Sequence, residues 1–115
     1  MCGFFGIFSP KGLNFDRGKL EILTNLIHHR GPDENGYFVN RNISLGFKRL
    51  SIIDIENGKQ PLISQNNRYV LVFNGEIYNY LELKDHLIGK NYIFKTNSDT
   101  EVLIKLYDCY GENMF

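Results

Sequence analysis

The chain has 115 residues, of which 43% are hydrophobic and 14% aromatic, and this composition excludes a disordered chain. Thirteen basic and thirteen acidic residues give a formal net charge of zero, so the basic excess of most nucleic-acid binders is missing. No apolar run approaches the roughly 18–20 residues that span a bilayer, and the N-terminus lacks the features of a signal peptide. We therefore expect a cytoplasmic protein with neither a nucleic-acid nor a membrane partner.

The first predicted elements are a strand and a helix. Residues 3–8 are short, apolar and aromatic, which is typical of a buried strand. Asp16 is suited to the N-cap of a helix, and Gly31-Pro32 to its end. One face of this helix carries the apolar residues Leu20, Leu23, Leu26 and Ile27.

The middle of the chain is predicted to contain further strands. Residues 36–39 and 43–47 flank a three-residue connection, as the strands of a hairpin do. Residues 50–55 are predicted as a third strand, and residues 58–61 as a loop. The β-branched and aromatic residues of 68–73 indicate a buried strand.

Two helices are predicted in the last third of the chain. The first covers residues 80–88 and ends at Gly89. The second begins at Ser98, which has capping-box spacing to Glu101. Its apolar face is expected to consist of Val102, Leu103, Leu106, Tyr107 and Tyr110. Because strands occur in adjacent runs, the pattern favours an α+β fold with antiparallel pairing in one folding unit.

The second residue carries the most distinctive chemistry. If Met1 is removed, Cys2 holds both a thiol and a free α-amine. An α-amine titrates at about 7.7–8.0 and a thiol at about 8.5, so the amine can act as the base that forms the thiolate. From its position alone, Cys2 is more simply interpreted as a small residue near a frayed terminus. A catalytic role for Cys2 therefore needs support from other motifs.

Six segments provide that support, spread from the first residue to residue 101. They are Met1-Cys2-Gly3, His29-Arg30-Gly31-Pro32-Asp33, Arg49-Leu50-Ser51-Ile52-Ile53-Asp54, Gln60-Pro61, Asn74-Gly75-Glu76-Ile77-Tyr78-Asn79 and Ser98-Asp99-Thr100-Glu101. In this order and spacing they resemble the N-terminal glutaminase domain of class II glutamine amidotransferases, which are N-terminal-nucleophile hydrolases. Within that class the sequence is most similar to the asparagine synthetase family.

The resemblance implies that residues 1–115 form a glutamine amidotransferase type-2 domain with a four-layer αββα sandwich. It implies that Cys2 hydrolyses L-glutamine and that the ammonia passes to a synthetase domain, which converts aspartate to asparagine. No cofactor is expected in these residues, and ATP and magnesium are expected in the missing synthetase domain. We expect an N-terminal fragment or truncated gene product that is poorly active alone. The sequence leaves open whether the protein forms a homodimer.

The resemblance also implies the roles of individual residues. The Asn74 side-chain amide and the Gly75 N–H form the oxyanion hole, Arg49 holds the α-carboxylate of glutamine, and Glu76 and Asp99 hold its α-ammonium. The same pocket is lined by backbone groups of Leu50, Ser51, Ile52 and Ile53.

Each of these roles has a structural alternative. Asn-Gly is a strong hairpin-turn signal, an arginine at a strand end is usually solvated, and an acid such as Asp99 suits the first turn of a helix. His29 is interpreted as part of a helix end rather than as a base, while Arg30 and Asp33 are expected to order the loops over the pocket. Cys109 is expected to be buried and inert.

Other functions stay open beside glutamine hydrolysis. One is a non-catalytic glutamine-binding or regulatory fragment, and another is a glutaminase half that serves a different acceptor, such as a sugar. A metal or redox protein would need a ligand cluster that Cys2, Cys109 and the three histidines do not provide by their spacing, so no metal is expected.

Overall fold

A computed structural model describes residues 1–52, 54 and 56–115. The chain divides into two compact units, although the sequence pattern predicts one. Unit 1 consists of Met1–Ser51, Lys59–Pro61 and Val72–Gly75. Unit 2 consists of Ile52–Gly58, Leu62–Leu71 and Glu76–Phe115.

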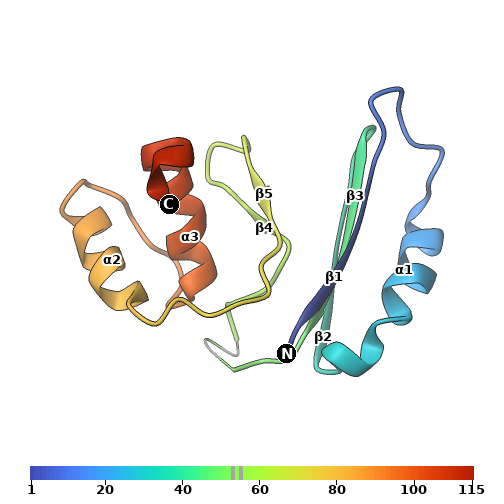
Figure 1. Ribbon diagram of the computed structural model, residues 1–115, viewed down its shortest axis with the longest axis horizontal. Helices are drawn as coiled ribbons and strands as arrows, with labels where there is room; N and C mark the ends of the chain where they lie inside the picture. Colours follow the sequence, from blue (N-terminus) through green and yellow to red (C-terminus); the bar gives the residue numbers. More distant parts are fainter. Residues whose placement is uncertain (53, 55) are drawn as a thin grey trace. The chain divides into compact units, whose positions relative to one another are not determined.

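Unit 1 is built on a three-stranded antiparallel sheet covered on one face by a helix (Figure 1). Strands β1 (Gly3–Phe8), β2 (Glu34–Val39) and β3 (Ile43–Arg49) lie in the order β1-β3-β2. Helix α1 (Arg17–Asn25) packs mainly against β3. The predicted hairpin of β2 and β3 is confirmed, and each strand is two residues longer than expected.

The contact between α1 and the sheet depends on a glycine. A Cβ at Gly46 would overlap the side chain of Thr24, which is fully buried on α1. Thr24 Oγ1 donates to the carbonyl of Leu20 at 2.7 Å, so its hydroxyl is satisfied within the helix. Gly46 therefore allows the helix to approach the centre of the sheet closely.

The boundaries of β1 are confirmed, but the described residues cover the strand predicted as buried on one face only. Phe4 is 53% exposed and Phe8 is 67% exposed, while Phe5 and Ile7 are partly buried. This alternation follows from the period of two residues in a strand: Phe5 and Ile7 lie on the face that carries α1, whereas Phe4 and Phe8 lie on the opposite face of an edge strand.

Helix α1 begins where the sequence predicts and ends earlier. The Asp16 side chain accepts a hydrogen bond from the Lys19 N–H at 2.8 Å and caps the helix. The helix stops at Asn25, and a short 3₁₀ helix η1 (His28–Arg30) precedes Gly31. Leu26 is consequently exposed rather than part of a buried helical face.

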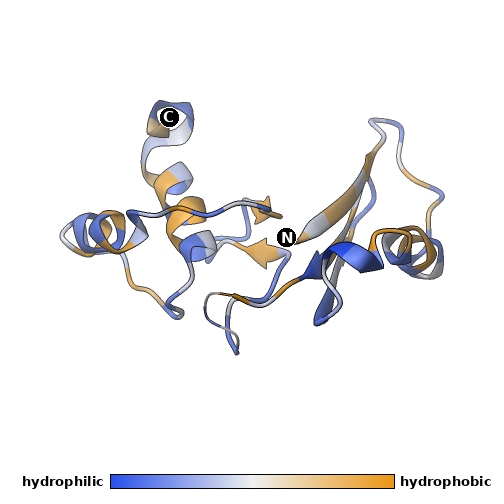
Figure 2. Ribbon diagram, turned by 60° about the horizontal axis from the view of Figure 1, so that its bottom comes forward, coloured by the Kyte–Doolittle hydropathy of each residue, from blue (hydrophilic) through white to orange (hydrophobic). Residues whose placement is uncertain are grey.

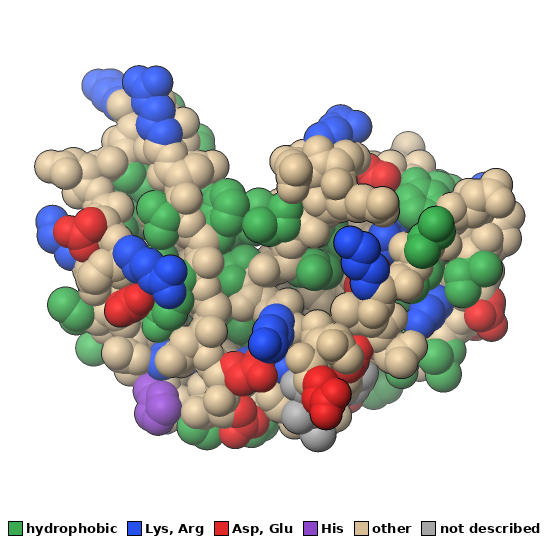
Figure 3. Space-filling model, turned by 180° about the vertical axis from the view of Figure 1, so that it is seen from behind, with side chains coloured by type: hydrophobic (Ala, Val, Ile, Leu, Met, Phe, Trp, Pro, Cys, Tyr) green, Lys and Arg blue, Asp and Glu red, His purple; other side chains and the backbone are tan. Residues whose placement is uncertain are grey.

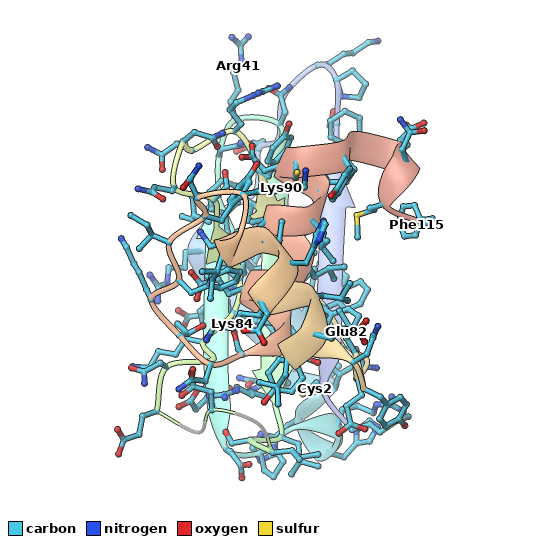
Figure 4. All side chains as sticks on the ribbon, turned by 90° about the vertical axis from the view of Figure 1, so that its left-hand side faces the viewer. Cys2, Arg41, Glu82, Lys84, Lys90 and Phe115 are labelled. Atoms are coloured by element: carbon cyan, nitrogen blue, oxygen red, sulfur yellow. The ribbon has the colours of Figure 1, made fainter. Side chains whose placement is uncertain are left out.

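The two ends of the sheet in unit 1 carry different residues. Because β1 and β2 run antiparallel to β3, the starts of β1 and β2 meet the end of β3. Cys2 lies at this end, and Arg41, in the β2–β3 connection, lies at the opposite end (Figure 4).

Unit 2 has a small core between two helices. Helices α2 (Tyr80–Ile88) and α3 (Asp99–Tyr110) bury Leu87, Val102 and Leu106. Tyr80 and Leu83 on α2 pack against this core, and so does the partly buried Cys109 on α3. The expected bounds of α2 are confirmed. A short 3₁₀ helix η2 (Gly111–Met114) follows α3.

The strands of unit 2 are shorter than the sequence predicts. Strand β5 (Val70–Leu71) replaces the expected strand of residues 68–73 and pairs with β4 (Leu62–Ile63), which was not predicted. Both consist of hydrophobic residues (Figure 2). The third strand predicted at residues 50–55 is wrong for its described residues, because Leu50, Ser51, Ile52 and Asp54 have no strand pairing. Ile53 and Ile55 lie outside the described residues.

The N-terminus of α3 uses only half of the predicted capping box. Ser98 Oγ accepts from the Glu101 N–H at 3.2 Å, as predicted. The Glu101 carboxylate, however, accepts from the N–H of Lys95 at 3.0 Å and of Thr96 at 2.7 Å. The Ser98 N–H donates instead to Thr96 Oγ1 at 3.3 Å. Glu101 therefore holds the segment before the helix rather than the cap residue itself.

The charge distribution and the helices of this fold bear on two of the expectations from composition. On the face shown in Figure 3, basic and acidic side chains are interspersed, in agreement with the net charge of zero. Within the described part of the chain, each helix is too short or too polar to cross a membrane.

Candidate active site

The thiol of Cys2 lies against the backbone of Leu50, which is 48 residues away in the sequence. The Leu50 N–H donates to Cys2 Sγ at 3.3 Å, and the Cys2 thiol donates to the Leu50 carbonyl at 3.5 Å. The pairing of Gly3 with Lys48 in the sheet brings the two residues together. Cys2 as a residue is only partly buried.

The segment from His29 to Asp33 packs around Cys2 and the end of β3. Arg30 Nε donates to the Cys2 carbonyl at 3.4 Å. Asp33 Oδ2 accepts from the Ser51 N–H at 2.8 Å. A Cβ at Gly31 would lie 2.5 Å from the backbone carbons of Lys48 and Arg49, so only glycine allows this approach. Arg30 and Asp33 thus bind backbone groups of Cys2 and Ser51, and their expected role in ordering loops over a pocket stays a prediction.

Asn74 shares a hollow of about 360 Å³ with the residue that follows Cys2. The hollow is lined by Gly3, Phe4, Ile27, His29, Arg30 and Asn74. Asn74 and Gly75 are exposed and precede helix α2, so the alternative of a hairpin turn between two strands is wrong. Sequence reasoning did not place His29 beside Asn74.

Arg49 is only 4% exposed, so the alternative of a solvated cation is wrong. Its Nη1 donates to Glu34 Oε2 at 2.9 Å, and the two residues are paired across β3 and β2. The Arg49 side chain lines a second hollow of about 240 Å³ together with Glu34, Lys59 and Gln60. Gln60 Oε1 in turn accepts from the Phe73 N–H at 2.6 Å.

The two predicted acids of the site are neighbours in unit 2. Asp99 is 6% exposed, and its Oδ2 accepts from the N–H of Ile77 at 3.1 Å. Ile77 directly follows Glu76, which is exposed. Asp99 is also the first residue of α3, where the helix dipole favours a negative charge.

The remaining predicted pocket residues lie around residue 52. Ser51 is held by Asp33 in unit 1, whereas Ile52 belongs to unit 2 and is 66% exposed. Ile53 lies outside the described residues. Sequence reasoning missed Asp54, whose Oδ2 accepts from the Asn97 N–H at 2.7 Å and ties this segment to the one that precedes α3.

The structure therefore assembles the predicted site in two sets. Unit 1 brings together Cys2, Leu50 and Ser51 through direct contacts, with Asn74 beside Gly3. Unit 2 brings Asp99 to the backbone next to Glu76. Among the residues with described positions, no group of three or more His, Cys, Asp or Glu side chains is arranged to hold a metal ion.

Comparisons with known proteins identify the family of the chain. The chain is 50% identical over 115 residues to the glutamine-hydrolysing asparagine synthetase 1 of Bacillus subtilis, covering 97% of this chain and 18% of that protein. It is 43% identical over 112 residues to asparagine synthetase B of Escherichia coli, covering 96% of this chain and 20% of that protein. The chain thus spans about a fifth of the length of these relatives. A family model for the glutamine amidotransferase domain matches residues 1–115, and the chain therefore belongs to the glutamine amidotransferase domain family.

Proposed function

We propose that this chain hydrolyses the side-chain amide of glutamine and uses Cys2 as the nucleophile. The observation that carries the proposal is the contact of Cys2 Sγ with the backbone of Leu50, next to the buried Arg49. The thiol of a partly buried cysteine that accepts a backbone N–H is suited to act as a nucleophile. Membership of the glutamine amidotransferase domain family supports glutamine as the substrate.

The proposed reaction begins with removal of Met1, which frees the α-amine of Cys2. The amine accepts the thiol proton, and Sγ forms a bond to the amide carbon of glutamine while the carbonyl electron pair moves to oxygen. The tetrahedral intermediate collapses, the carbon–nitrogen bond breaks, and the nitrogen leaves as ammonia with the transferred proton. Water then attacks the thioester, which gives glutamate and regenerates the thiol.

The proposed oxyanion hole consists of the Asn74 side-chain amide and the Gly75 N–H. Donors aimed at the developing oxyanion typically lower the barrier by about 2.7–4 kcal/mol each. Support comes from the hollow that Asn74 shares with Gly3, the neighbour of Cys2.

Substrate binding is proposed to use charges of both signs. Arg49 binds the α-carboxylate, with backbone groups of Leu50, Ser51, Ile52 and Ile53 beside it. Glu76 and Asp99 bind the α-ammonium, and their proximity within unit 2 supports a shared role.

At a larger scale, we propose a four-layer αββα sandwich and delivery of the ammonia to a synthetase domain that forms asparagine from aspartate. The exposed face of β1 supports an additional layer on the side opposite α1. The names of the relatives support the acceptor, because they are glutamine-hydrolysing asparagine synthetases. ATP and magnesium belong to that synthetase domain in this proposal.

The direct test is covalent labelling by an electrophilic glutamine analogue. We expect one adduct per chain, mapped by mass spectrometry to a Cys2 that is the first residue. The Cys2→Ala variant should not be labelled, whereas the Cys109→Ala variant should react like the original protein.

Two results would contradict the proposal. Labelling of Cys109 would exclude Cys2 as the nucleophile. Retention of Met1 in an active protein would exclude the α-amine of Cys2 as the base. A protein that binds glutamine without releasing glutamate would instead be the non-catalytic binding fragment.

A further inference from the structure

Three residues outside the paired strands meet at the sheet end that carries Cys2. Cys2 directly precedes β1, Asp33 directly precedes β2, and Leu50 directly follows β3. Both neighbouring strands run antiparallel to β3, so the three residues share one end of the sheet. Leu50 lies beyond the ladder, so strand pairing by itself does not fix the direction of its peptide groups.

Asp33 binds the backbone on both sides of Leu50. Its N–H donates to the carbonyl of Arg49 at 3.0 Å. Its Oδ2 accepts from the N–H of Ser51 at 2.8 Å. The residue between these two attachment points is Leu50, whose N–H and carbonyl both contact Cys2 Sγ. The two bonds of Asp33 therefore set the orientation of the groups that contact the sulfur.

The two Leu50 contacts differ in what they do when the thiol loses its proton. The thiol donates to the Leu50 carbonyl, and that bond ends with deprotonation. The Leu50 N–H donates to the sulfur, and that bond strengthens when the sulfur becomes charged. Since the thiolate is the nucleophile, a fixed Leu50 N–H orients the reactive sulfur.

We infer that Asp33 is a positioning residue for the nucleophile, and that it holds Leu50 so that the Leu50 N–H remains directed at Cys2 Sγ. This inference rests on the proposed function. Asp33 has no assigned contact with glutamine, and the proposed charged anchors Arg49 and Asp99 keep their own partners without its side chain. Its loss therefore lowers turnover more than substrate affinity.

The test uses the product of the complete reading frame, with glutamate release from glutamine as the assay. The Asp33→Ala variant is expected to lose about tenfold or more in kcat, because a hydrogen bond to a charged acceptor is lost. Its KM for glutamine should stay within about twofold of the original. The Asp33→Asn variant keeps an oxygen that can accept from Ser51, so its kcat should recover to within about threefold of the original.

Asp16→Ala is the matched control, because it also removes a carboxylate that accepts a backbone N–H at 2.8 Å in unit 1. Its kcat should equal that of the original protein. Normal kcat in Asp33→Ala, or an Asn variant as slow as the Ala variant, overturns the inference.

Two further outcomes separate folding and function from positioning. If Asp33→Ala fails to fold by circular dichroism, Asp33→Glu decides, because it keeps the charge and displaces the acceptor by one methylene group. A reduced kcat with unchanged KM then supports the inference, and a normal kcat overturns it. Absence of glutaminase activity in the original protein overturns the proposed function instead.

Discussion

Arg49 is a buried cation whose charge is paired within the protein. A buried charge is costly unless it is paired, and Glu34 lies 2.9 Å from the Arg49 Nη1 atom. The ion pair orients the guanidinium before any ligand arrives. In the proposed function this reduces the loss of side-chain freedom when the carboxylate of glutamine binds.

Tyr92 is a residue whose protonation is altered by the fold. Burial raises the pKa of Tyr92 to about 12, and the neighbouring Cys109 and Asp108 contribute in the same direction. The hydroxyl donates to Asp108 Oδ2 at 3.4 Å. The folded protein therefore keeps the Tyr92 proton at a pH where the unfolded chain loses it.

This shift predicts a loss of stability at high pH. Between the ordinary tyrosine pKa of 10.0 and about 12, the folded state binds more protons than the unfolded state, so the free energy of unfolding falls as pH rises. Tyr92→Phe should therefore become less destabilising, relative to the original protein, as pH increases through this range. Urea unfolding at several pH values measures the difference.

Tyr78→Phe provides the control, since the Tyr78 side chain is 91% exposed. The difference between this variant and the original should not change over the same pH range. A difference for Tyr92→Phe that also stays constant with pH would show that the hydroxyl contributes only through its hydrogen bond.

Helix α3 depends on a carboxylate that reaches behind its own N-terminus. Glu101 is buried and accepts from the backbone of Lys95 and Thr96 and from Thr96 Oγ1 at 2.6 Å. Lys105 Nζ lies 3.6 Å from Glu101 Oε1, one turn along the helix. These contacts join the start of α3 to the preceding segment, which includes Asn97 and its bond to Asp54.

Replacement of Glu101 by alanine should lower the free energy of unfolding by about 2–3 kcal/mol, because several partly buried donors lose their acceptor. Urea denaturation followed by circular dichroism measures the change. Glu82→Ala, which removes an exposed carboxylate in the first turn of α2, should cost about 0.5 kcal/mol or less. Equal losses in the two variants would mean that the Glu101 contacts contribute little.

At the same scale, the helices were more predictable than the strands. Asp16, Ser98 and Gly89 mark helix ends through hydrogen bonds to residues three or four positions away, so their sequence pattern is sufficient. Strand β4 has two residues, too few to show a period. The apolar residues of 50–55 suggested a strand, but a strand also needs a partner, and none pairs with the described residues there.

At the scale of the whole molecule, unit 1 exposes one face of an edge strand. Phe4 and Phe8 project from β1 on the face opposite α1, and β1 has only β3 as a described neighbour. Exposed apolar residues on an edge strand promote association between chains. The relatives are about five times longer, and the proposed sandwich would cover this face with another layer.

We therefore predict that the 115-residue chain, produced alone, self-associates through β1. Phe8→Lys should raise the concentration needed for association about tenfold, because a large apolar side chain no longer becomes buried. Sedimentation velocity over a concentration series measures this. Ile22→Lys is the matched control variant, since Ile22 is also 67% exposed but lies on α1. An association that Phe8→Lys leaves unchanged would contradict the prediction.

The sequence by itself determined the helix starts, the β2–β3 hairpin and the membership of a family, because these depend on local hydrogen bonds, turn residues, and the order and spacing of short motifs. Only the tertiary structure decided that Leu50 faces the thiol of Cys2 and that Asp33 binds Ser51, since strand register sets contacts between residues so far apart in the chain. It also decided that Arg49 is buried and paired, because an arginine at a strand end becomes buried only where a neighbouring strand supplies its carboxylate partner.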